Sequence, residues 1–448
     1  MTGRALRVLA VSAIAFAQSA PPAHAVSPPA VDERRLPDAG PPAPEHPTAQ
    51  HDECATAPPA ATAEPGQLGG MDLPSVWALT RGAGQTVAVI DTGVTRHRRL
   101  PHLVPGGDYV SRHDGTNDCD GHGTIVAGII GATPDATDPE GFTGIAPDVS
   151  VLSIRQSSNK FHAVDDPGGT GVGDVATLAA AVRTAADLGA TVINISTVAC
   201  VPADTVPADD ALGAALSYAV DVKNVVVVTA AGNVGGPGQC QDHNPRDAAG
   251  ADQVSTVASP AWYDDLVLAV GSVAADGTPS AFSLAGPWVD VAAPGEGVVS
   301  LASAGDGLVD VAPSGAPLSG TSYAVPVVSA VAALVRARSP ELTARQVMQR
   351  IEDTAHSSSS GWNPVVGHGT IDPLSAVSGP GVRPSTPRAA AAIDAVESVT
   401  EPATTRTALR GAALCFALTA CVGVLSTTVG RRTRRHDSVR VPGAVSRE

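Results

Sequence analysis

Residues 86–93 read Thr-Val-Ala-Val-Ile-Asp-Thr-Gly, an apolar run of the kind that forms a buried strand, followed by an acidic turn. Similar short runs recur toward the C-terminus, and stretches with helical periodicity lie between them. The expected strands are 86–90, 149–154, 191–195, 224–230 and 266–270, and the expected helices are 174–188 and 208–222. Nearly continuous Val/Ile strands that alternate with helices are typical of a parallel sheet covered on both faces. The sequence therefore predicts an α/β fold with a mostly parallel central sheet.

The composition supports one large globular domain. The chain has 448 residues, of which 43% are hydrophobic and 16% are charged, which excludes wholesale disorder. A domain of about 300 residues with appendages fits this length better than several small domains. The patterned region, 68–378, is the predicted domain. Because a formal net charge of −16 repels phosphate backbones, we expect no nucleic-acid partner.

The N-terminus has the pattern of an export signal. Arg4 and Arg7 precede the apolar run 8–17, and a small-x-small cleavage pattern ends at Ala25. The apolar run is too short to span a bilayer. We therefore predict a signal peptide over 1–25, cleaved after its last residue.

The C-terminal region has the pattern of a membrane anchor. Residues 379–408 are rich in Pro, Ala and Thr and are predicted to be a linker. The uncharged part of 409–430 lies between Arg410 and Arg431, and about 20 helical residues span roughly 30 Å, one bilayer core. A buried core helix is the alternative, but the linker and the flanking arginines favour a single transmembrane helix. The basic tail 431–448 is expected in the cytoplasm, and the body of the protein outside it, at the cell membrane.

The six cysteines are divided between the predicted membrane helix and the exported part of the chain. Two lie in the predicted membrane helix, and the four in the exported part are Cys54, Cys119, Cys200 and Cys240. Disulfides persist outside the cytoplasm, but four cysteines allow three pairings, and the sequence alone does not choose among them. A zinc site is the rival interpretation, yet no C-x-x-C pair occurs and the acidic clusters lack the spacing of a calcium loop. We therefore predict no metal site and no cofactor.

Four polar residues are expected where open α/β sheets bind ligands, at the carboxyl ends of strands and the starts of helices. Asp91 follows the strand 86–90, and Asn233 follows the strand 224–230. His122 begins a helix of small residues. Ser322 begins a helix that is apolar on nearly all sides and in which a proline at 326 should fall in the first turn.

The four residue types together predict nucleophilic catalysis by a serine. A hydroxyl such as that of Ser322 needs a base, and the imidazole of His122 titrates in the useful range. A carboxylate such as Asp91 would hold the correct tautomer and stabilise the imidazolium. The amide of Asn233 and a backbone N–H at the helix start would form an oxyanion hole. Each residue alone is typical of a turn, whereas the order Asp, His, Asn, Ser at these places favours a hydrolase.

The segments that carry these residues resemble the signature segments of subtilases, the subtilisin-like serine proteases. They are Val89–Gly93, Gly121–Thr124 and Ser319–Ala324, and Ala231–Asn233 resembles the oxyanion segment of that family. Four further features narrow the resemblance: the export signal, the Pro/Ala-rich N-terminal arm 26–67, the four exported cysteines and the C-terminal anchor. With these features the chain is similar to the mycosins, the membrane-anchored subtilases of type VII secretion systems.

The resemblance implies a subtilisin-like three-layer fold with helices on both faces of the sheet. It implies a serine endopeptidase that acts on a protein or peptide substrate and associates with a type VII secretion membrane complex. It also implies the disulfides Cys54–Cys119 and Cys200–Cys240. The first would fasten the Pro/Ala-rich extension 26–67 beside His122. Because that extension lacks the patterned core of an inhibitory prodomain, we expect it to wrap the body rather than plug the cleft.

The chain departs from the usual subtilase pattern at a few positions. Ile125 stands where many members have a second His, and Tyr323 where many have Met; both are expected to pack behind the site. The resemblance implies that an extended substrate pairs with strand edges, and that these edges are 150–155 and 194–198. The insertion 156–173 is expected to hang over the cleft.

A second interpretation comes from a different class of protein. A scaffold that stabilises a membrane secretion complex, with dispensable protease activity, would also need the arm and the anchor. A freely diffusing digestive protease fits poorly, because a tethered enzyme cannot reach bulk protein.

Overall fold

The computed structural model describes residues 27–60, 66–136, 141–169, 171–205, 207–236, 239–247, 253–356 and 361–379. The predicted signal peptide, membrane helix and basic tail lie outside these residues, as does the linker apart from Gly379. Within the described part of the chain, no helix is both long enough and apolar enough to cross a membrane.

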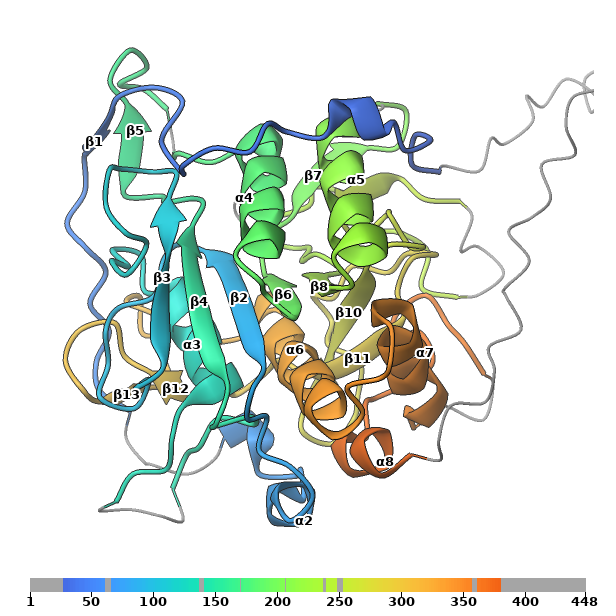
Figure 1. The fold of residues 1–448 in the computed structure, drawn as a ribbon. Helices are drawn as coiled ribbons and strands as arrows, with labels where there is room; N and C mark the ends of the chain where they lie inside the picture. The colour runs from blue at the N-terminus through green and yellow to red at the C-terminus, as the bar shows by residue number, and fades with distance from the viewer. Residues whose placement is uncertain are drawn as a thin grey trace, which may run out of the picture. The chain divides into compact units, whose positions relative to one another are not determined.

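A seven-stranded parallel sheet forms the centre of the fold, in the order β11-β10-β8-β6-β2-β4-β3 (Figure 1). The strands are β2 (Thr86–Asp91), β3 (Leu103–Asp108), β4 (Ser150–Arg155), β6 (Val192–Ile195), β8 (Val226–Ala230), β10 (Leu268–Val273) and β11 (Val291–Pro294). All five strands expected from the sequence are in this sheet, so the prediction of a parallel sheet is confirmed. The central strands are buried along nearly their whole length, as their unbroken Val/Ile runs predict.

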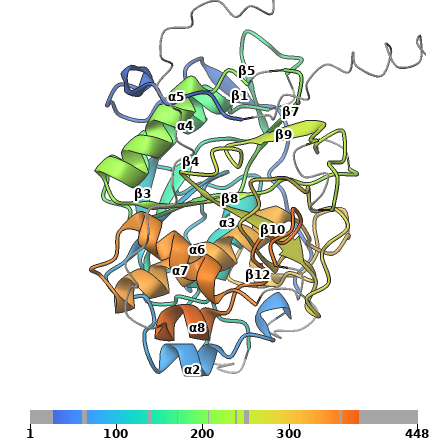
Figure 2. The same cartoon turned by 90° about the vertical axis from the view of Figure 1, so that its right-hand side faces the viewer.

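Helices cover both faces of the sheet. Figure 2 shows α4 (Val175–Asp187) and α5 (Asp210–Ser217) on one side, and α3 (His122–Gly131), α6 (Thr321–Arg338) and α7 (Ala344–Thr354) on the other. The expected helix 208–222 is α5 continued by a π-helical turn, η3 (Tyr218–Val222). Every residue of α6 from Tyr323 to Val335 is buried, so this helix is the core element that its apolar sequence predicts.

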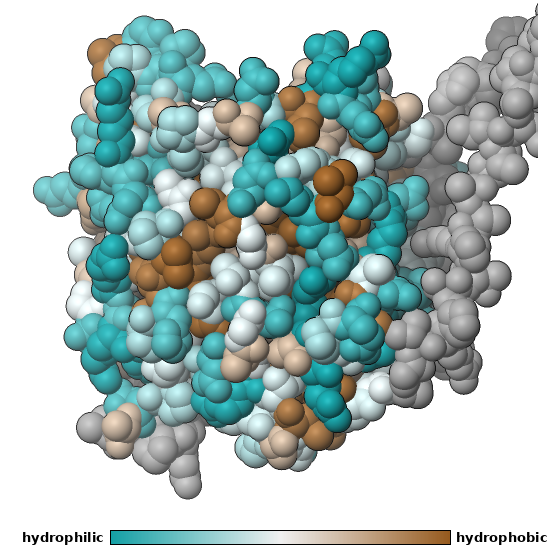
Figure 3. Space-filling view, in the orientation of Figure 1, coloured by the Kyte–Doolittle hydropathy of each residue, from teal (hydrophilic) through white to brown (hydrophobic). Residues whose placement is uncertain are grey.

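The remaining elements are short. The helices α2 (Leu73–Trp77) and α8 (Pro373–Ser378) lie near each other at one end of the molecule (Figures 1 and 2). Two small antiparallel sheets pair β7 (Ala199–Pro202) with β9 (Thr256–Ser259), and β12 (Ser300–Leu301) with β13 (Leu308–Val309). Hydrophilic side chains dominate the face seen in Figure 3, and hydrophobic ones gather near its centre, over the region of β2 and β4.

The N-terminal arm lies along the body, as expected. It contains two short 3-10 turns, η1 (Glu33–Arg35) and η2 (Gly66–Leu68), and one strand, β1 (Thr48–Gln50). β1 pairs with β5 (Phe161–Ala163), which belongs to the insertion 156–173 (Figure 1). The insertion is therefore tied to the arm through backbone hydrogen bonds.

The expectation of two free strand edges is wrong for the strands themselves. β4 pairs with β2 on one side and with β3 on the other, and β6 pairs with β2 and β8. For β4 the cause is β3, whose sequence Leu-Val-Pro-Gly-Gly-Asp does not look like a strand. Proline is tolerated in an edge strand, and β3 is the edge of this sheet.

Removal of the arm should not raise the hydrolytic activity that the sequence predicts. A chain truncated through residue 66 loses β1 and the disulfide partner Cys54, so we expect peptide hydrolysis that is equal to or slower than that of the full chain. The initial rate on one peptide substrate measures this, with thermal melting as the control for folding. A rate several times higher would instead identify the arm as an inhibitor.

Candidate active site

Asp91 and His122 form a hydrogen-bonded pair at the edge of the sheet. Asp91 is the last residue of β2 and His122 the first residue of α3, and Nδ1 of the imidazole lies 2.7 Å from Oδ1 of the carboxylate. The Asp91 side chain is fully buried, whereas the His122 side chain is 27% exposed. The imidazole is therefore held at Nδ1 by a buried carboxylate, so Nε2 is the ring nitrogen that Asp91 does not engage.

The negative charge of Asp91 beside His122 suits an imidazole that first accepts a proton as a base and then donates it as an acid. Burial alone lowers the pKa of His122, but the negative charge of Asp91, their hydrogen bond and the charges of Asp118 and Asp120 outweigh burial and raise it. The imidazolium is thus stabilised within the site, which is the role expected of the carboxylate in a serine hydrolase.

Ser322 and Asn233 come together at the start of α6. The Asn233 Oδ1 accepts hydrogen bonds from the backbone N–H of Thr321 at 2.9 Å and from its hydroxyl at 3.0 Å, which fixes the orientation of the amide. A Cβ built on Gly320 would lie 3.1 Å from the Ser322 Oγ and 3.7 Å from the Asn233 Nδ2. The hydroxyl and the amide therefore border one small space. The Ser322 N–H belongs to the first turn of the helix, whose N–H groups lack partners in a preceding turn.

Tyr323 links the two halves of the site. It directly follows Ser322, and its ring lies 5.3 Å from the imidazole of His122 between centroids, at an interplanar angle of 38°. Tyr323 and Ile125 are both largely buried, but they line a pocket together with His122, so they border the site rather than pack behind it as expected. The structure thus gathers all four residues that the sequence nominated: Asp91, His122, Asn233 and Ser322.

The position of Pro326 differs from the expectation. It lies in the second turn of α6 rather than the first, where it cannot donate the hydrogen bond that a helix would normally give to the carbonyl of Ser322. The hydroxyl of Ser196, one residue beyond β6, donates to that carbonyl at 2.8 Å instead. A side chain from the sheet therefore satisfies the group that the proline leaves without a partner.

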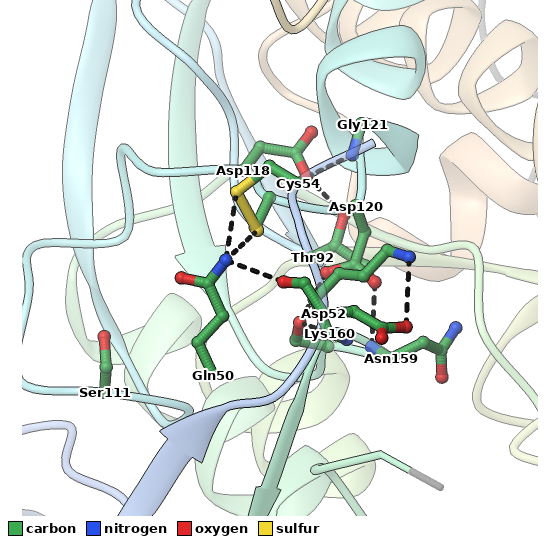
Figure 4. The surroundings of a disulfide bond; sticks show 12 residues. Gln50, Asp52, Cys54, Thr92, Ser111, Asp118, Asp120, Gly121, Asn159 and Lys160 are labelled. Atoms are coloured by element: carbon green, nitrogen blue, oxygen red, sulfur yellow. Dashed lines mark hydrogen bonds and ion pairs between the residues drawn. A yellow bond between two sulfur atoms is a disulfide. The ribbon is translucent and has the colours of Figure 1, made fainter. Parts of the chain in front are cut away.

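Asp118 is a buried carboxylate that the sequence did not assign to the site (Figure 4). It accepts four hydrogen bonds: from the Thr92 hydroxyl at 2.9 Å, the Gly121 N–H at 2.7 Å, and the Thr124 N–H and hydroxyl at 2.9 and 2.6 Å. The Gly123 N–H donates to the Thr92 hydroxyl. The backbone on both sides of His122 is thereby tied to the residue that follows Asp91. The sequence signal that could have identified Asp118 was one threonine in each motif, Thr92 and Thr124, with an acidic residue between the two motifs.

Burial raises the pKa of Asp118 to about 6, because loss of solvent outweighs the four hydrogen bonds that favour the ionised form. The folded pKa lies above the ordinary value of 3.8, so the folded state retains a proton that the unfolded state has lost between about pH 4 and pH 6. The ionised carboxylate therefore reduces stability as pH rises through this window. A shift of about two units corresponds to about 3 kcal/mol.

Substituting Asp118→Asn should remove this dependence. We expect the free energy of unfolding of wild type, relative to that of the variant, to fall by about 2 kcal/mol between pH 4 and pH 7, since the unfolded carboxyl is already partly ionised at pH 4. Urea unfolding at the two pH values measures the difference. An unchanged difference would mean that Asp118 is ionised over this whole pH range. Asp265→Asn, at an exposed position, is the matched control.

The two disulfides are the pairs implied by the resemblance, Cys54–Cys119 and Cys200–Cys240. The first joins the arm to the residue next to Asp118 (Figure 4). In the second, the Cys240 N–H donates to the Asn233 carbonyl at 2.8 Å. Each disulfide therefore supports one half of the site.

Comparison with known proteins agrees with this geometry. The model of the subtilase family matches residues 82–369. Mycosin-4 of Mycobacterium tuberculosis (strain ATCC 25618 / H37Rv) is 57% identical, over 97% of this chain and 98% of its own length. Subtilisin DY of Bacillus licheniformis is 31% identical over 61% of this chain and 85% of its own.

Solved structures give the same relationship. The crystal structure of MycP1 from Mycobacterium smegmatis has a TM-score of 0.72 and 42% identity, and covers 80% of this chain and 98% of its own. A chain in the structure of an intact ESX-5 inner membrane complex has a TM-score of 0.73 and 38% identity, and the match covers 90% of this chain and 100% of that one. The chain therefore belongs to the subtilase family of serine proteases and, within that family, to the mycosins.

Proposed function

We propose that this serine protease is an exported, membrane-anchored endopeptidase that processes proteins of a type VII secretion system. The observation that carries the catalytic part is the hydrogen-bonded pair Asp91–His122 beside the start of α6, where Ser322 and Asn233 meet. The secretion part is supported by similarity to chains from ESX-1 and ESX-5 systems. The anchor is supported by the apolar segment 409–430 and the arginines around it.

We assign each residue a step in the proposed reaction. His122 Nε2 removes the proton of the Ser322 hydroxyl as its Oγ attacks the scissile carbonyl, and Asp91 stabilises the imidazolium that forms. The oxyanion accepts hydrogen bonds from the Asn233 amide and the Ser322 N–H. The imidazolium then gives its proton to the leaving nitrogen, and the acyl group stays on Ser322. Water, activated by the same imidazole, releases the second product.

Labelling with a fluorophosphonate probe tests the nucleophile. Wild type should be labelled covalently, and Ser322→Ala should not. Ser339→Ala, at the far end of α6, is the matched control and should be labelled like wild type. Equal labelling of Ser322→Ala would remove the proposed nucleophile.

The scaffold function remains a second candidate, because a similar chain forms part of an inner membrane complex. In a deletion strain, complementation with wild type and with Ser322→Ala separates the two candidates. If Ser322→Ala restores secretion fully, the essential role is structural. If it fails while the complex still assembles, proteolysis is the required activity.

Loss of the Asn233 amide should slow turnover without abolishing it. We expect Asn233→Ala to lower kcat about 10²- to 10³-fold with little change in KM, because the amide binds the oxyanion and not the ground-state carbonyl. Steady-state hydrolysis of a peptide measures both constants. If kcat is unchanged and KM rises by the same factor instead, Asn233 acts in substrate binding. Asn159→Ala, at an exposed position, is the control.

A further inference from the structure

The arm is fixed to the body at both ends of a short extended stretch. At one end, Cys54 is bonded to Cys119, and the Ala55 N–H donates to the Cys119 carbonyl at 2.7 Å. At the other end, the Ala60 N–H donates to the carbonyl of Leu308 in β13, also at 2.7 Å. Figure 4 shows the first of these attachments beside Asp118 and Gly121. The stretch 54–60, called the strap below, is therefore held next to the start of α3.

Side chains alternate along this strap. Ala55 and Ala57 are partly buried, and Ala57 packs against the hydrophobic core, whereas Thr56 between them is exposed. An extended backbone places residues i and i+2 on one side and i+1 on the other. The two alanines therefore face the body of the enzyme.

The alanines line a pocket that also contains the catalytic histidine. The pocket has a volume of about 110 Å³. Besides Ala55 and Ala57, its walls include His122, Ile125, Leu318 and Tyr323. Asp120 is at its border, and among the described lining residues no lysine or arginine is present. The pocket is thus mainly apolar, with one negative charge.

The proposed reaction determines which part of the substrate occupies this pocket. The scissile carbonyl oxygen must point to Asn233, which is not among the pocket's lining residues. The leaving nitrogen must face His122, because this imidazole delivers its proton. The first residue of the leaving fragment is bonded to that nitrogen, so its side chain lies on the His122 side of Ser322, and the pocket is lined by His122 and not by Asn233.

We propose that the N-terminal arm is part of the substrate site: Ala55 and Ala57 form one wall of the pocket for the first residue of the leaving fragment and limit its size. This inference rests on the proposed protease function and names the substrate class more closely. A dry cavity of about 150 Å³ holds a benzene ring, so a pocket of about 110 Å³ suits small and medium aliphatic side chains. The carboxylate of Asp120 disfavours acidic ones.

Peptide profiling tests the inference. The full chain is incubated with peptides from a digested bacterial proteome, and mass spectrometry identifies the residue that begins each new product. Wild-type products should begin mainly with aliphatic side chains up to the size of Leu. In Ala55→Leu and Ala57→Leu, the ratio of Leu to Ala at this position should fall about tenfold, because one methylene in an apolar pocket changes selectivity at least tenfold. The preference on the acyl side should not change.

Thr56→Leu is the matched control, since its side chain points away from the pocket. Profiles of Ala55→Leu and Ala57→Leu identical to that of Thr56→Leu would overturn the inference, as would a change confined to the acyl side. Fluorophosphonate labelling of each variant shows that the site is folded. If a leucine variant is not labelled, Ala57→Gly serves in its place and should raise the ratio of Leu to Ala about tenfold.

The outcomes for the two proposals differ. If wild type cleaves peptides but all arm variants share one profile, the arm inference is wrong and the protease function is supported. If wild type neither cleaves peptides nor is labelled, the proposed catalytic function fails and the arm inference fails with it.

Discussion

Replacing His122 with alanine should lower kcat for peptide hydrolysis about 10⁶-fold, which is the factor that loss of this base or of the nucleophile costs in subtilisin. The physical reason is that, among the residues that the structure describes, His122 is the one base that we assign to the Ser322 hydroxyl. Asp91 is buried behind the imidazole and bonded to it. With the imidazole removed, its carboxylate stays at the bottom of the space and does not reach the hydroxyl.

The measurement needs a product assay sensitive enough to follow single turnovers, with Ser322→Ala as the reference for a fully disabled site. His122→Ala and Ser322→Ala should show similar residual rates, because the two residues act as one unit. His113→Ala, at an exposed position in the loop before α3, should keep the wild-type rate. A His122→Ala rate within tenfold of wild type would show that another group serves as the base.

The sequence predicted the parts of the site that follow from backbone direction. In a parallel sheet every strand ends at the same edge, so a polar residue after β2 and another after β8 had to lie near each other. The start of α6 joined them because that helix is apolar on all sides and must cross the core. The local sequence pattern was sufficient to predict the places of Asp91, Asn233 and Ser322 and to predict the five long Val/Ile strands.

The sequence did not predict the features that depend on partners distant in the chain. β3 contains a proline and two glycines, and only its hydrogen bonds with β4 reveal it as a strand. Pro326 is acceptable in the second turn of α6 because Ser196 satisfies a carbonyl far away in sequence. Asp118 lies in a run of acidic residues, and only burial among four donors distinguishes it from its neighbours. In each case the deciding contact comes from another element.

The N-terminal arm is another feature whose role depends on contacts with distant parts of the chain. Its composition indicated an extended segment without a core of its own, which is how it lies on the body. The alternation of Ala55, Thr56 and Ala57 carries meaning only once the strap is fixed at both ends. A disulfide at one end and a backbone hydrogen bond at the other turn an irregular segment into a wall of defined position.

Replacing Asp91 with asparagine should lower kcat about 10⁴-fold, the effect of the equivalent change in a serine protease of another fold. The amide nitrogen of asparagine can donate to Nδ1 of His122, which favours the tautomer that carries its proton on Nε2. That nitrogen then cannot accept the proton of Ser322. The shape of the site is nearly unchanged, because the two side chains have the same size.

The same substitution should also move the pH profile, and the sign of the shift distinguishes an orienting carboxylate from a merely structural one. The charge of Asp91 raises the pKa of His122, and the base works only when it is neutral, so wild-type activity is lost as pH falls through that raised pKa. Without the charge the pKa of His122 falls, and the acid limb of kcat/KM should move to lower pH even though the plateau is far lower. Asp114→Asn, which removes an exposed charge, should leave both the plateau and the limb in place. If Asp91→Asn lowers the plateau without moving the acid limb, the carboxylate positions the ring but does not set its charge.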